Sequence, residues 1–199
     1  METAKSTIKV LKILLKDFST KKTITSLAKE TSMSRVGIWK VLKKLESDKL
    51  IILSAIGTGR TSIYSISLNW KNPILEKVFA VALTEESLKN QRWLSNFKEL
   101  EAKVDFLVIY GSILHFPKEA NDIDVIGVAK KNKFLEIEKI MSNIQKTQLK
   151  RIHALNFTRD EFKKELEKPN KAFVDSIKKG IILFGQENFI RFMKNIKNG

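Results

Sequence analysis

The chain has 199 residues, of which 43% are hydrophobic, so it is long enough to form two small domains or one of medium size around a packed core. It contains no cysteine, which excludes disulfides, thiolate zinc sites and cysteine nucleophiles. No run approaches the roughly 18 uncharged apolar residues of a membrane span, and the first residues lack an apolar signal-peptide core. We therefore expect a cytoplasmic protein with no membrane partner.

The net charge of +15 favours binding to polyanions, because lysine and arginine side chains contact phosphates and release counterions. Residues 1–75 hold 14 Lys and Arg against 5 Asp and Glu, a net charge of +9. Residues 76–199 hold 23 against 17, a net charge of +6. A lysine-rich surface without a polyanionic partner is the alternative, but the concentration of charge in the shorter N-terminal part favours nucleic acid.

The N-terminal part contains three helical patterns followed by two strand patterns. Apolar residues recur at helical spacing over residues 6–17. Thr25 is expected to cap a short second helix, and Ser32 or Ser34 a third helix that ends near residue 48. In the third helix, Ile38, Leu42 and Leu45 have i, i+4 and i+7 spacing and are expected to face the core. Two strands are expected within residues 50–68, around a turn that contains two glycines.

This order of elements, with the segment TSLAKETSMSRVGIWKVLKKLESDKLI, resembles a winged helix-turn-helix domain, to which we assign residues 1–71. The resemblance implies that the third helix inserts its N-terminal part into the major groove of DNA. Arg35 is placed to reach a guanine edge or a phosphate, and the lysines of this helix to reach phosphates. The expected DNA-binding residues are Ser34, Arg35, Trp39, Lys40, Lys43, Lys44 and, at the tip of the wing, Arg60.

Two alternatives stay open for this domain. Trp39 can pack inside the domain instead of touching DNA, and many winged helices bind proteins. DNA is expected ahead of RNA, although no residue pattern decides between them.

The rest of the chain predicts a helical connector over residues 72–101, which is a candidate homodimer interface, and a second domain over residues 102–199. In the second domain, strand patterns over 104–110, 122–129 and 149–157 alternate with helical patterns, and residues 180–185 form a short apolar stretch. The expected fold class is therefore α/β (α+β), with a small mixed sheet flanked by helices.

The segment DFLVIYGSILHFPKEANDIDVIGVA contains the residues that indicate a phosphate and metal site. A buried strand ends at Gly111-Ser112, nine residues separate Ser112 from Asp122, and Asp122 and Asp124 begin the next strand. Alternate residues of a strand face the same way, so the two carboxylates project together and repel each other unless a cation such as Mg²⁺ lies between them. Gly111 lets the backbone approach a phosphate, and Ser112 opens a short helix whose free N–H groups favour an anion.

This arrangement resembles the polymerase-beta-type nucleotidyltransferase superfamily, in particular its small single-domain members, over about residues 90–190. The resemblance implies that Asp122 and Asp124 bind Mg²⁺ or Mn²⁺ and that Gly111-Ser112 holds a nucleoside triphosphate. It also implies attack on the α-phosphorus with release of pyrophosphate.

The sequence departs from that family at a third carboxylate, which active members usually carry on a later strand. The matching position is His153 or, with a different strand register, Arg151 or Leu155, and none of these is a carboxylate. A neutral His153 would be a catalytic base, or else a plain polar residue in a degenerate pocket. His115 is expected in a surface loop, with phosphate contact as the alternative.

Three functions remain open from the sequence. The first is a DNA-binding transcriptional regulator whose nucleotidyltransferase-like domain binds nucleotide or has degenerated. The second is an active enzyme that transfers a nucleotidyl group, with AMP expected, to a protein, an RNA or a small molecule, including an antitoxin that modifies a partner toxin. The third is an interaction module in which both domains bind proteins.

Overall fold

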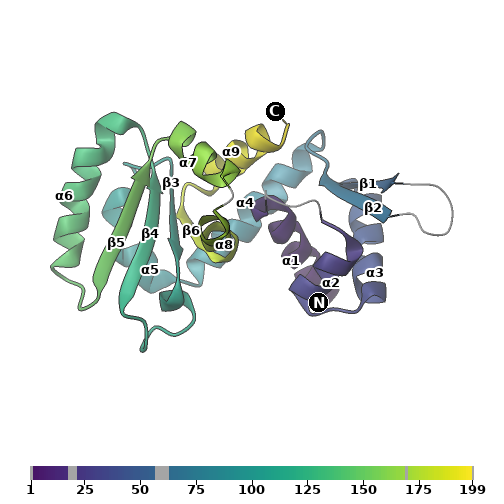
Figure 1. Ribbon diagram of the computed structural model, residues 1–199, viewed down its shortest axis with the longest axis horizontal. Helices are drawn as coiled ribbons and strands as arrows, with labels where there is room; N and C mark the ends of the chain where they lie inside the picture. Colours follow the sequence, from purple (N-terminus) through teal and green to yellow (C-terminus); the bar gives the residue numbers. More distant parts are fainter. Residues whose placement is uncertain (1, 18–21, 57–62, 169, 199) are drawn as a thin grey trace. The chain divides into compact units, whose positions relative to one another are not determined.

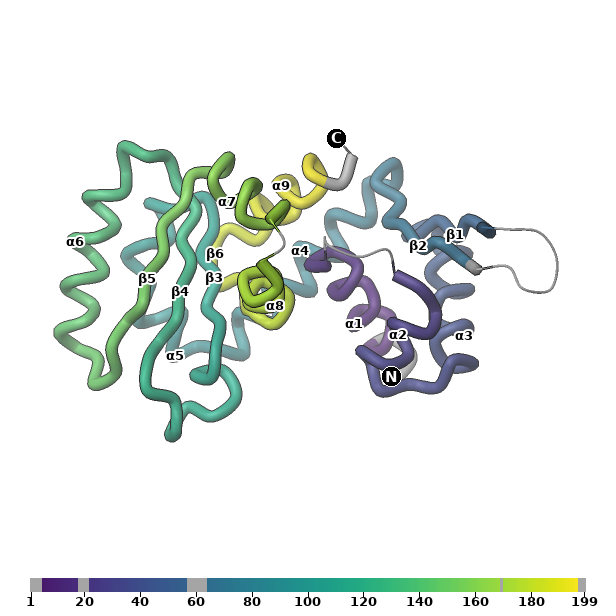
Figure 2. Tube along the Cα trace, in the orientation of Figure 1, coloured from purple at the N-terminus to yellow at the C-terminus, as the bar shows by residue number. Residues whose placement is uncertain are grey.

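The computed structural model describes residues 2–17, 22–56, 63–168 and 170–198 (Figures 1 and 2). The chain divides into two compact units, residues 1–79 (unit 1) and residues 80–199 (unit 2). Helices and strands alternate, and unit 2 contains a small mixed sheet, so the expected mixed class of fold is confirmed. In the part of the chain that is described, no helix is long and apolar enough to cross a membrane.

Unit 1 begins with three helices, α1 (Glu2–Lys16), α2 (Ile24–Thr31) and α3 (Arg35–Ser47). The strands β1 (Ile51–Ile56) and β2 (Ile63–Leu68) follow and pair antiparallel over their full length. The predicted order of three helices and two strands is therefore the observed one.

The core of unit 1 is built from the apolar faces of these helices and the inner side of β2. The three α3 residues at positions i, i+4 and i+7 that were expected to face inward are completely buried, because this spacing puts them on one helix face. The buried apolar residues of unit 1 include Val10, Leu11, Leu14, Leu15, Leu27, Ile38, Val41, Leu42, Leu45, Ile51, Ile66 and Leu68.

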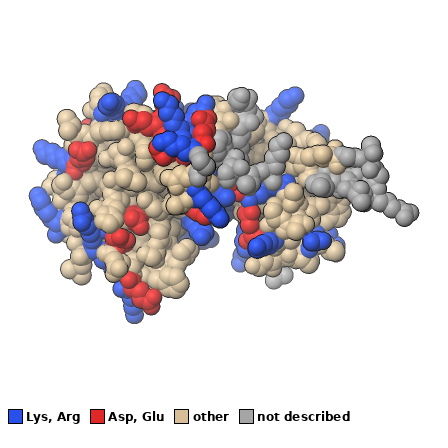
Figure 3. Space-filling model, in the orientation of Figure 1, with Lys and Arg blue, Asp and Glu red and all other residues tan. Residues whose placement is uncertain are grey.

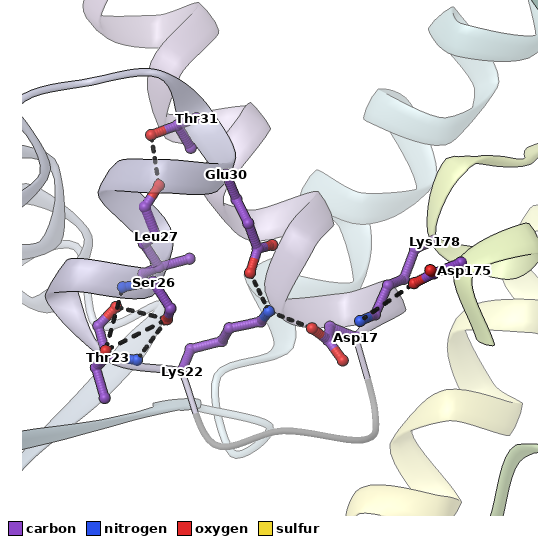
Figure 4. A network of polar contacts seen from close by, with 9 residues as sticks. All are labelled: Asp17, Lys22, Thr23, Ser26, Leu27, Glu30, Thr31, Asp175 and Lys178. Carbon is purple, nitrogen blue, oxygen red and sulfur yellow. Dashed lines mark hydrogen bonds and ion pairs between the residues drawn. The ribbon is translucent and has the colours of Figure 1, made fainter. Parts of the chain in front are cut away.

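The helix boundaries of unit 1 follow from capping side chains. Thr23, and not Thr25, caps α2: its hydroxyl accepts a bond from the Ser26 N–H, and the Ser26 hydroxyl accepts one from the Thr23 N–H (Figure 4). Thr25 lies inside the helix because this reciprocal capping box forms two residues earlier. Ser34 caps α3 by accepting a bond of 3.0 Å from the Gly37 N–H, whereas Ser32 has a left-handed backbone (φ 58°) and ends α2.

A buried lysine ties the end of α1 to α2. The Lys22 side chain is 5% exposed, and its ammonium contacts the carboxylates of Asp17 and Glu30 (Figure 4). Burial alone lowers the pKa of Lys22, but the hydrogen bonds to Asp17 and Glu30 outweigh it, so the pKa is raised above its usual value. This cation is therefore held charged in the interior of unit 1.

The segment expected to be a helical connector contains α4 (Pro73–Leu88), α5 (Gln91–Asn96) and the 3₁₀ turn η1 (Lys98–Leu100). Pro73 is the first residue of α4, a position that requires no backbone N–H. The boundary between the two compact units lies inside α4, after residue 79.

The sheet of unit 2 has four strands in the order β5 (Arg151–Phe157), β4 (Asp122–Val128), β3 (Phe106–Tyr110) and β6 (Ile181–Phe184). Strand β3 pairs antiparallel with both β4 and β6, whereas β4 and β5 are parallel. A parallel pair needs a crossover, and α6 (Phe134–Gln145) lies between β4 and β5 in the chain.

Helices cover both faces of this sheet (Figure 1). On one face, α5 and α6 pack on alternate residues of the strands, through a cluster that includes Trp93, Phe97, Leu107, Ile109, Ile123, Val125, Ile137 and Met141. The other face carries α7 (Arg159–Glu167), α8 (Lys171–Lys179) and α9 (Gln186–Asn198). There Phe106 of β3 makes aromatic contacts with Phe162, Phe189 and Phe192.

Charged side chains lie over the surfaces of both units. On the face that Figure 3 shows, lysine and arginine side chains are spread over each unit, with aspartate and glutamate scattered among them. The net charge of +15 is therefore not confined to one unit.

Candidate functional site

Three polar residues form a row across three neighbouring strands of the sheet in unit 2. Tyr110 of β3 pairs with Asp124 of β4, and Asp124 pairs with His153 of β5. Residues that pair directly across strands face the same side, so the three side chains emerge together on the face that carries α7 to α9. In the register of β4 and β5, His153 lies opposite Asp124, and Arg151 lies opposite Asp122.

The imidazole of His153 lies close to both carboxylates. Its Nδ1 atom is 3.2 Å from Oδ2 of Asp122 and 3.6 Å from Oδ1 of Asp124. One donor atom from each of the three residues lies within 4.8 Å of the other two, so the group could hold a metal ion. The side chains are partly open to solvent, with exposed fractions of 32%, 22% and 46% for Asp122, Asp124 and His153.

Gly111 makes room for this cluster. Its backbone has φ 85°, a left-handed value that favours glycine, and a β-carbon at this position would lie 2.4 Å from Oδ2 of Asp124. The Asp124 carboxylate therefore rests directly on the backbone of the turn. Ser112, which follows, has an exposed side chain and begins η2 (Ser112–Leu114), a single 3₁₀ turn.

The electrostatics of the row reflect two neighbouring carboxylates. Burial raises the pKa of Asp124, and the charge of Asp122 raises it further, while His153 opposes both effects. Burial, followed by the charges of Asp124 and Asp122, also raises the pKa of Tyr110. A cation bound here would relieve the repulsion between the carboxylates.

Tyr110 is a site residue that sequence reasoning missed. The available signal was its place at the end of the strand that leads into Gly111-Ser112. An antiparallel pairing of that strand with the strand of Asp122 and Asp124 brings Tyr110 opposite one of the carboxylates. His115, in contrast, is exposed beside Phe116 and is not part of the metal-holding group.

Six of the seven residues expected to bind DNA lie on α3 or at its N-cap. Arg35 and Lys40 are exposed, and neither forms an ion pair with another described residue. Lys43 and Lys44 are exposed as well, and form pairs within the helix, at 2.7 Å to Glu46 and 3.4 Å to the carboxylate one residue past α3. Exposed pairs of this kind contribute little stability, so both lysines can exchange them for phosphate contacts.

Trp39, which was expected to bind DNA, packs against other residues of unit 1. The ring of Trp39 is half-buried, 5.1 Å from the ring of Tyr64 on β2, with the Lys43 ammonium 5.0 Å from the Trp39 centroid. Trp39 therefore packs α3 against β2. Arg60 lies outside the described residues.

Val36 was not singled out from the sequence. It lies in the first turn of α3, next to Arg35, and 66% of it is exposed although it is apolar. Apolar side chains on a groove-reading helix can contact the methyl group of thymine.

No protein-family model, curated protein sequence or solved structure matches this chain. The residues of α3 and the Asp122–Asp124–His153 cluster are therefore the observations from which a function can be proposed.

Proposed function

We propose that the protein is a DNA-binding transcriptional regulator. Unit 1 acts as a winged helix-turn-helix domain, and unit 2 is a nucleotidyltransferase-like domain that binds a nucleoside triphosphate together with a divalent cation. The observation that carries the proposal is the exposed first half of α3, where Arg35, Val36 and Lys40 stand free of the core.

The dimensions and the charge of α3 suit a DNA groove. A helix of 13 residues is about 20 Å long. Its diameter, about 10–12 Å with side chains, fits a major groove that is about 12 Å wide. Its N-terminal residues would meet base edges, where Arg35 offers a bidentate donor and Val36 an apolar contact. Lys40, Lys43 and Lys44 would then neutralise phosphates, which provide affinity without sequence information.

The cluster in unit 2 supports the nucleotide part of the proposal. Gly111 leaves the turn without a side chain, and the two carboxylates that begin β4 provide oxygen ligands for a cation that would also contact phosphates. When bound, such a cation would neutralise triphosphate charge. The residues of the chain orient it: β4 fixes the two aspartates on one face, and β5 brings His153 beside them.

An active nucleotidyltransferase is the second candidate, favoured by the same pair of aspartates. In that reaction an acceptor hydroxyl oxygen would bond to the α-phosphorus while the bond from this phosphorus to the bridging oxygen breaks. Pyrophosphate would leave, and the hydroxyl proton would pass to water. We rank it second because His153 stands opposite Asp124, where the family resemblance leads us to expect a third carboxylate.

A DNA titration at several salt concentrations tests the regulator. Fluorescence anisotropy of a labelled duplex with the full chain should give an affinity that falls about 100-fold between about 50 and 200 mM salt, as expected for roughly four phosphate contacts. An affinity that is independent of salt, or no binding at low salt, would overturn the DNA-binding proposal. Incubation with labelled ATP, with Asp122→Asn as the control, separates the regulator from the enzyme: label transferred by wild type alone would make the enzyme the better account.

A further inference from the structure

We propose that His153 is itself a metal ligand, and that the Asp122–Asp124–His153 cluster selects a first-row transition-metal dication such as Mn²⁺ over Mg²⁺. This inference rests on the proposed cation site of unit 2 and gives that site a specific chemistry.

The position of the His153 imidazole is suitable for a metal ligand. Two ligand atoms that each lie about 2.1–2.2 Å from one ion, at a right angle, are about 3 Å apart. The Nδ1 atom of His153 is 3.2 Å and 3.6 Å from the nearest carboxylate oxygens of Asp122 and Asp124. The Nδ1 atom therefore already lies at nearly the spacing from each carboxylate that a shared ion requires, and all three donor atoms lie within 4.8 Å of one another.

The strand pairing fixes the backbone positions of the three cluster residues relative to one another. His153 pairs with Asp124 inside a parallel ladder that runs over seven residue pairs, from Asp122–Arg151 to Val128–Phe157. The carboxylate of Asp124 is confined on its other side by the backbone of Gly111. The backbone positions from which the three side chains extend therefore cannot move apart without disturbing the register of two strands or the turn.

The chemistry of the donors also favours a transition metal. Mg²⁺ prefers an octahedral shell of oxygen ligands and water, whereas first-row transition metals such as zinc, copper, iron and nickel also accept imidazole nitrogen. Carboxylate oxygen suits Mg²⁺ and Mn²⁺ alike, so the imidazole nitrogen is the donor that discriminates. A nitrogen donor in place of a third carboxylate therefore weakens the site for Mg²⁺ more than for a transition metal.

An alternative role for His153 predicts the opposite change in metal affinity when the imidazole is removed. If a protonated imidazole only neutralised the two carboxylates, it would exclude cations, and removing it would strengthen the binding of Mg²⁺ and Mn²⁺ alike. As a ligand, His153 should strengthen Mn²⁺ binding, so its removal should weaken it. The direction of the change in His153→Ala therefore separates the two roles.

The experiment is a titration of the full chain with MnCl₂ and, separately, MgCl₂, followed by calorimetry and, for Mn²⁺, by electron paramagnetic resonance. We expect Mn²⁺ to bind at least about tenfold more tightly than Mg²⁺ to the wild type. His153→Ala should lose about tenfold or more of the Mn²⁺ affinity. In the resonance experiment, nitrogen coupling to Mn²⁺ should be present in the wild type and absent from the variant.

Two further variants complete the design. His153→Asp converts the cluster to oxygen ligands and should narrow the difference between Mn²⁺ and Mg²⁺. His115→Ala removes the other histidine of the chain, which is exposed and outside the cluster, and should leave every affinity unchanged. Far-ultraviolet circular dichroism confirms that each variant is folded.

Equal affinity of the wild type for the two ions, unchanged Mn²⁺ affinity in His153→Ala, or absence of nitrogen coupling would each overturn the inference. Titration of the protein with ATP, in the presence of Mg²⁺ or of Mn²⁺, distinguishes failure of this metal inference from failure of the proposed nucleotide binding. If ATP binds equally well with Mg²⁺ and Mn²⁺, the nucleotide proposal stands and the role of His153 falls. If Mn²⁺ binds selectively but ATP does not bind, the metal inference stands and the nucleotide proposal falls.

Discussion

Oδ2 of Asp124 lies so close to the Gly111 backbone that a β-carbon on Gly111 would be 2.4 Å away from it. Gly111 also has φ 85°, which strains any residue with a side chain by about 1–2 kcal/mol. The turn after β3 can therefore lie this close to the carboxylate on β4 only because residue 111 has no side chain.

Gly111→Ala should lose Mn²⁺ and ATP binding while the chain remains folded. The added methyl group must displace the Asp124 carboxylate, and the strained φ should lower the free energy of unfolding by about 1–2 kcal/mol. Urea unfolding and calorimetry measure the two effects. Gly111→Ala that binds Mn²⁺ as wild type does would show that the position of the carboxylate does not matter.

Asp124→Asn should abolish metal binding without destabilising the metal-free protein. Burial and the charge of Asp122 both raise the pKa of Asp124, so its negative charge is disfavoured where it stands. A neutral amide of the same shape removes that repulsion, and the melting temperature without metal should be equal to or above that of wild type. Addition of Mn²⁺ should then raise the melting temperature of wild type alone. A clear loss of stability in metal-free Asp124→Asn would mean that the carboxylate is structural.

Lys22→Met should destabilise unit 1 by about 1–3 kcal/mol, because it removes a buried ammonium that contacts two carboxylates. The contribution of Lys22 also has a defined pH dependence. Its pKa in the folded chain is raised above the usual 10.5, so the stabilisation is fully present below pH 10.5 and is lost as the pH rises through the folded-state pKa. Urea unfolding of wild type and Lys22→Met from pH 8 upward should therefore converge above about pH 10.5.

The matched control for this pair is Lys29→Met, which removes an exposed lysine from α2. It should change stability by less than about 0.5 kcal/mol, at any pH in the series. A constant difference between wild type and Lys22→Met across the whole pH range would refute the role of the ammonium charge.

Substitutions at Ser34 should separate helix capping from DNA contact. Ser34→Ala removes the cap of α3 and should cost about 1 kcal/mol of stability. Ser34→Asp keeps the cap but adds a negative charge at the end of α3 proposed to enter the groove, so it should be stable and bind DNA more weakly than wild type. If Ser34→Asp keeps the full DNA affinity, the N-terminus of α3 does not approach the phosphates.

The sequence predicted most of the local structure of both units because that structure depends on short-range periodicity. The i, i+4, i+7 spacing identified Ile38, Leu42 and Leu45 as core residues, and the alternation of a strand put Asp122 and Asp124 on one face. Capping was less certain, since Thr23 and Thr25 have equal chemistry and only the partner residue three positions later distinguishes them.

Contacts that depend on tertiary pairing were harder to predict. The alignment of His153 with Asp124 is a register between parallel strands separated by a helix, which no local pattern fixes. The short apolar strand β6 was expected only as an apolar stretch, and Tyr110 became a site residue only through the antiparallel pairing of β3 with β4. The residues of the cluster could be named from the sequence, but their geometry could not.

The central claim is that α3 reads DNA, and the most direct measurement compares two double variants that remove the same charge. Arg35→Ala with Lys40→Ala alters α3, whereas Lys89→Ala with Lys139→Ala removes two exposed lysines of unit 2. In anisotropy titrations of one labelled duplex, we predict that the α3 variant loses about 10- to 100-fold in affinity and that its salt dependence flattens by about two units of slope. The control should stay within about twofold of wild type at 150 mM salt, a range set by screening of distant charges. Equal losses in the two variants would contradict the claim, because binding would then depend on net charge and not on α3.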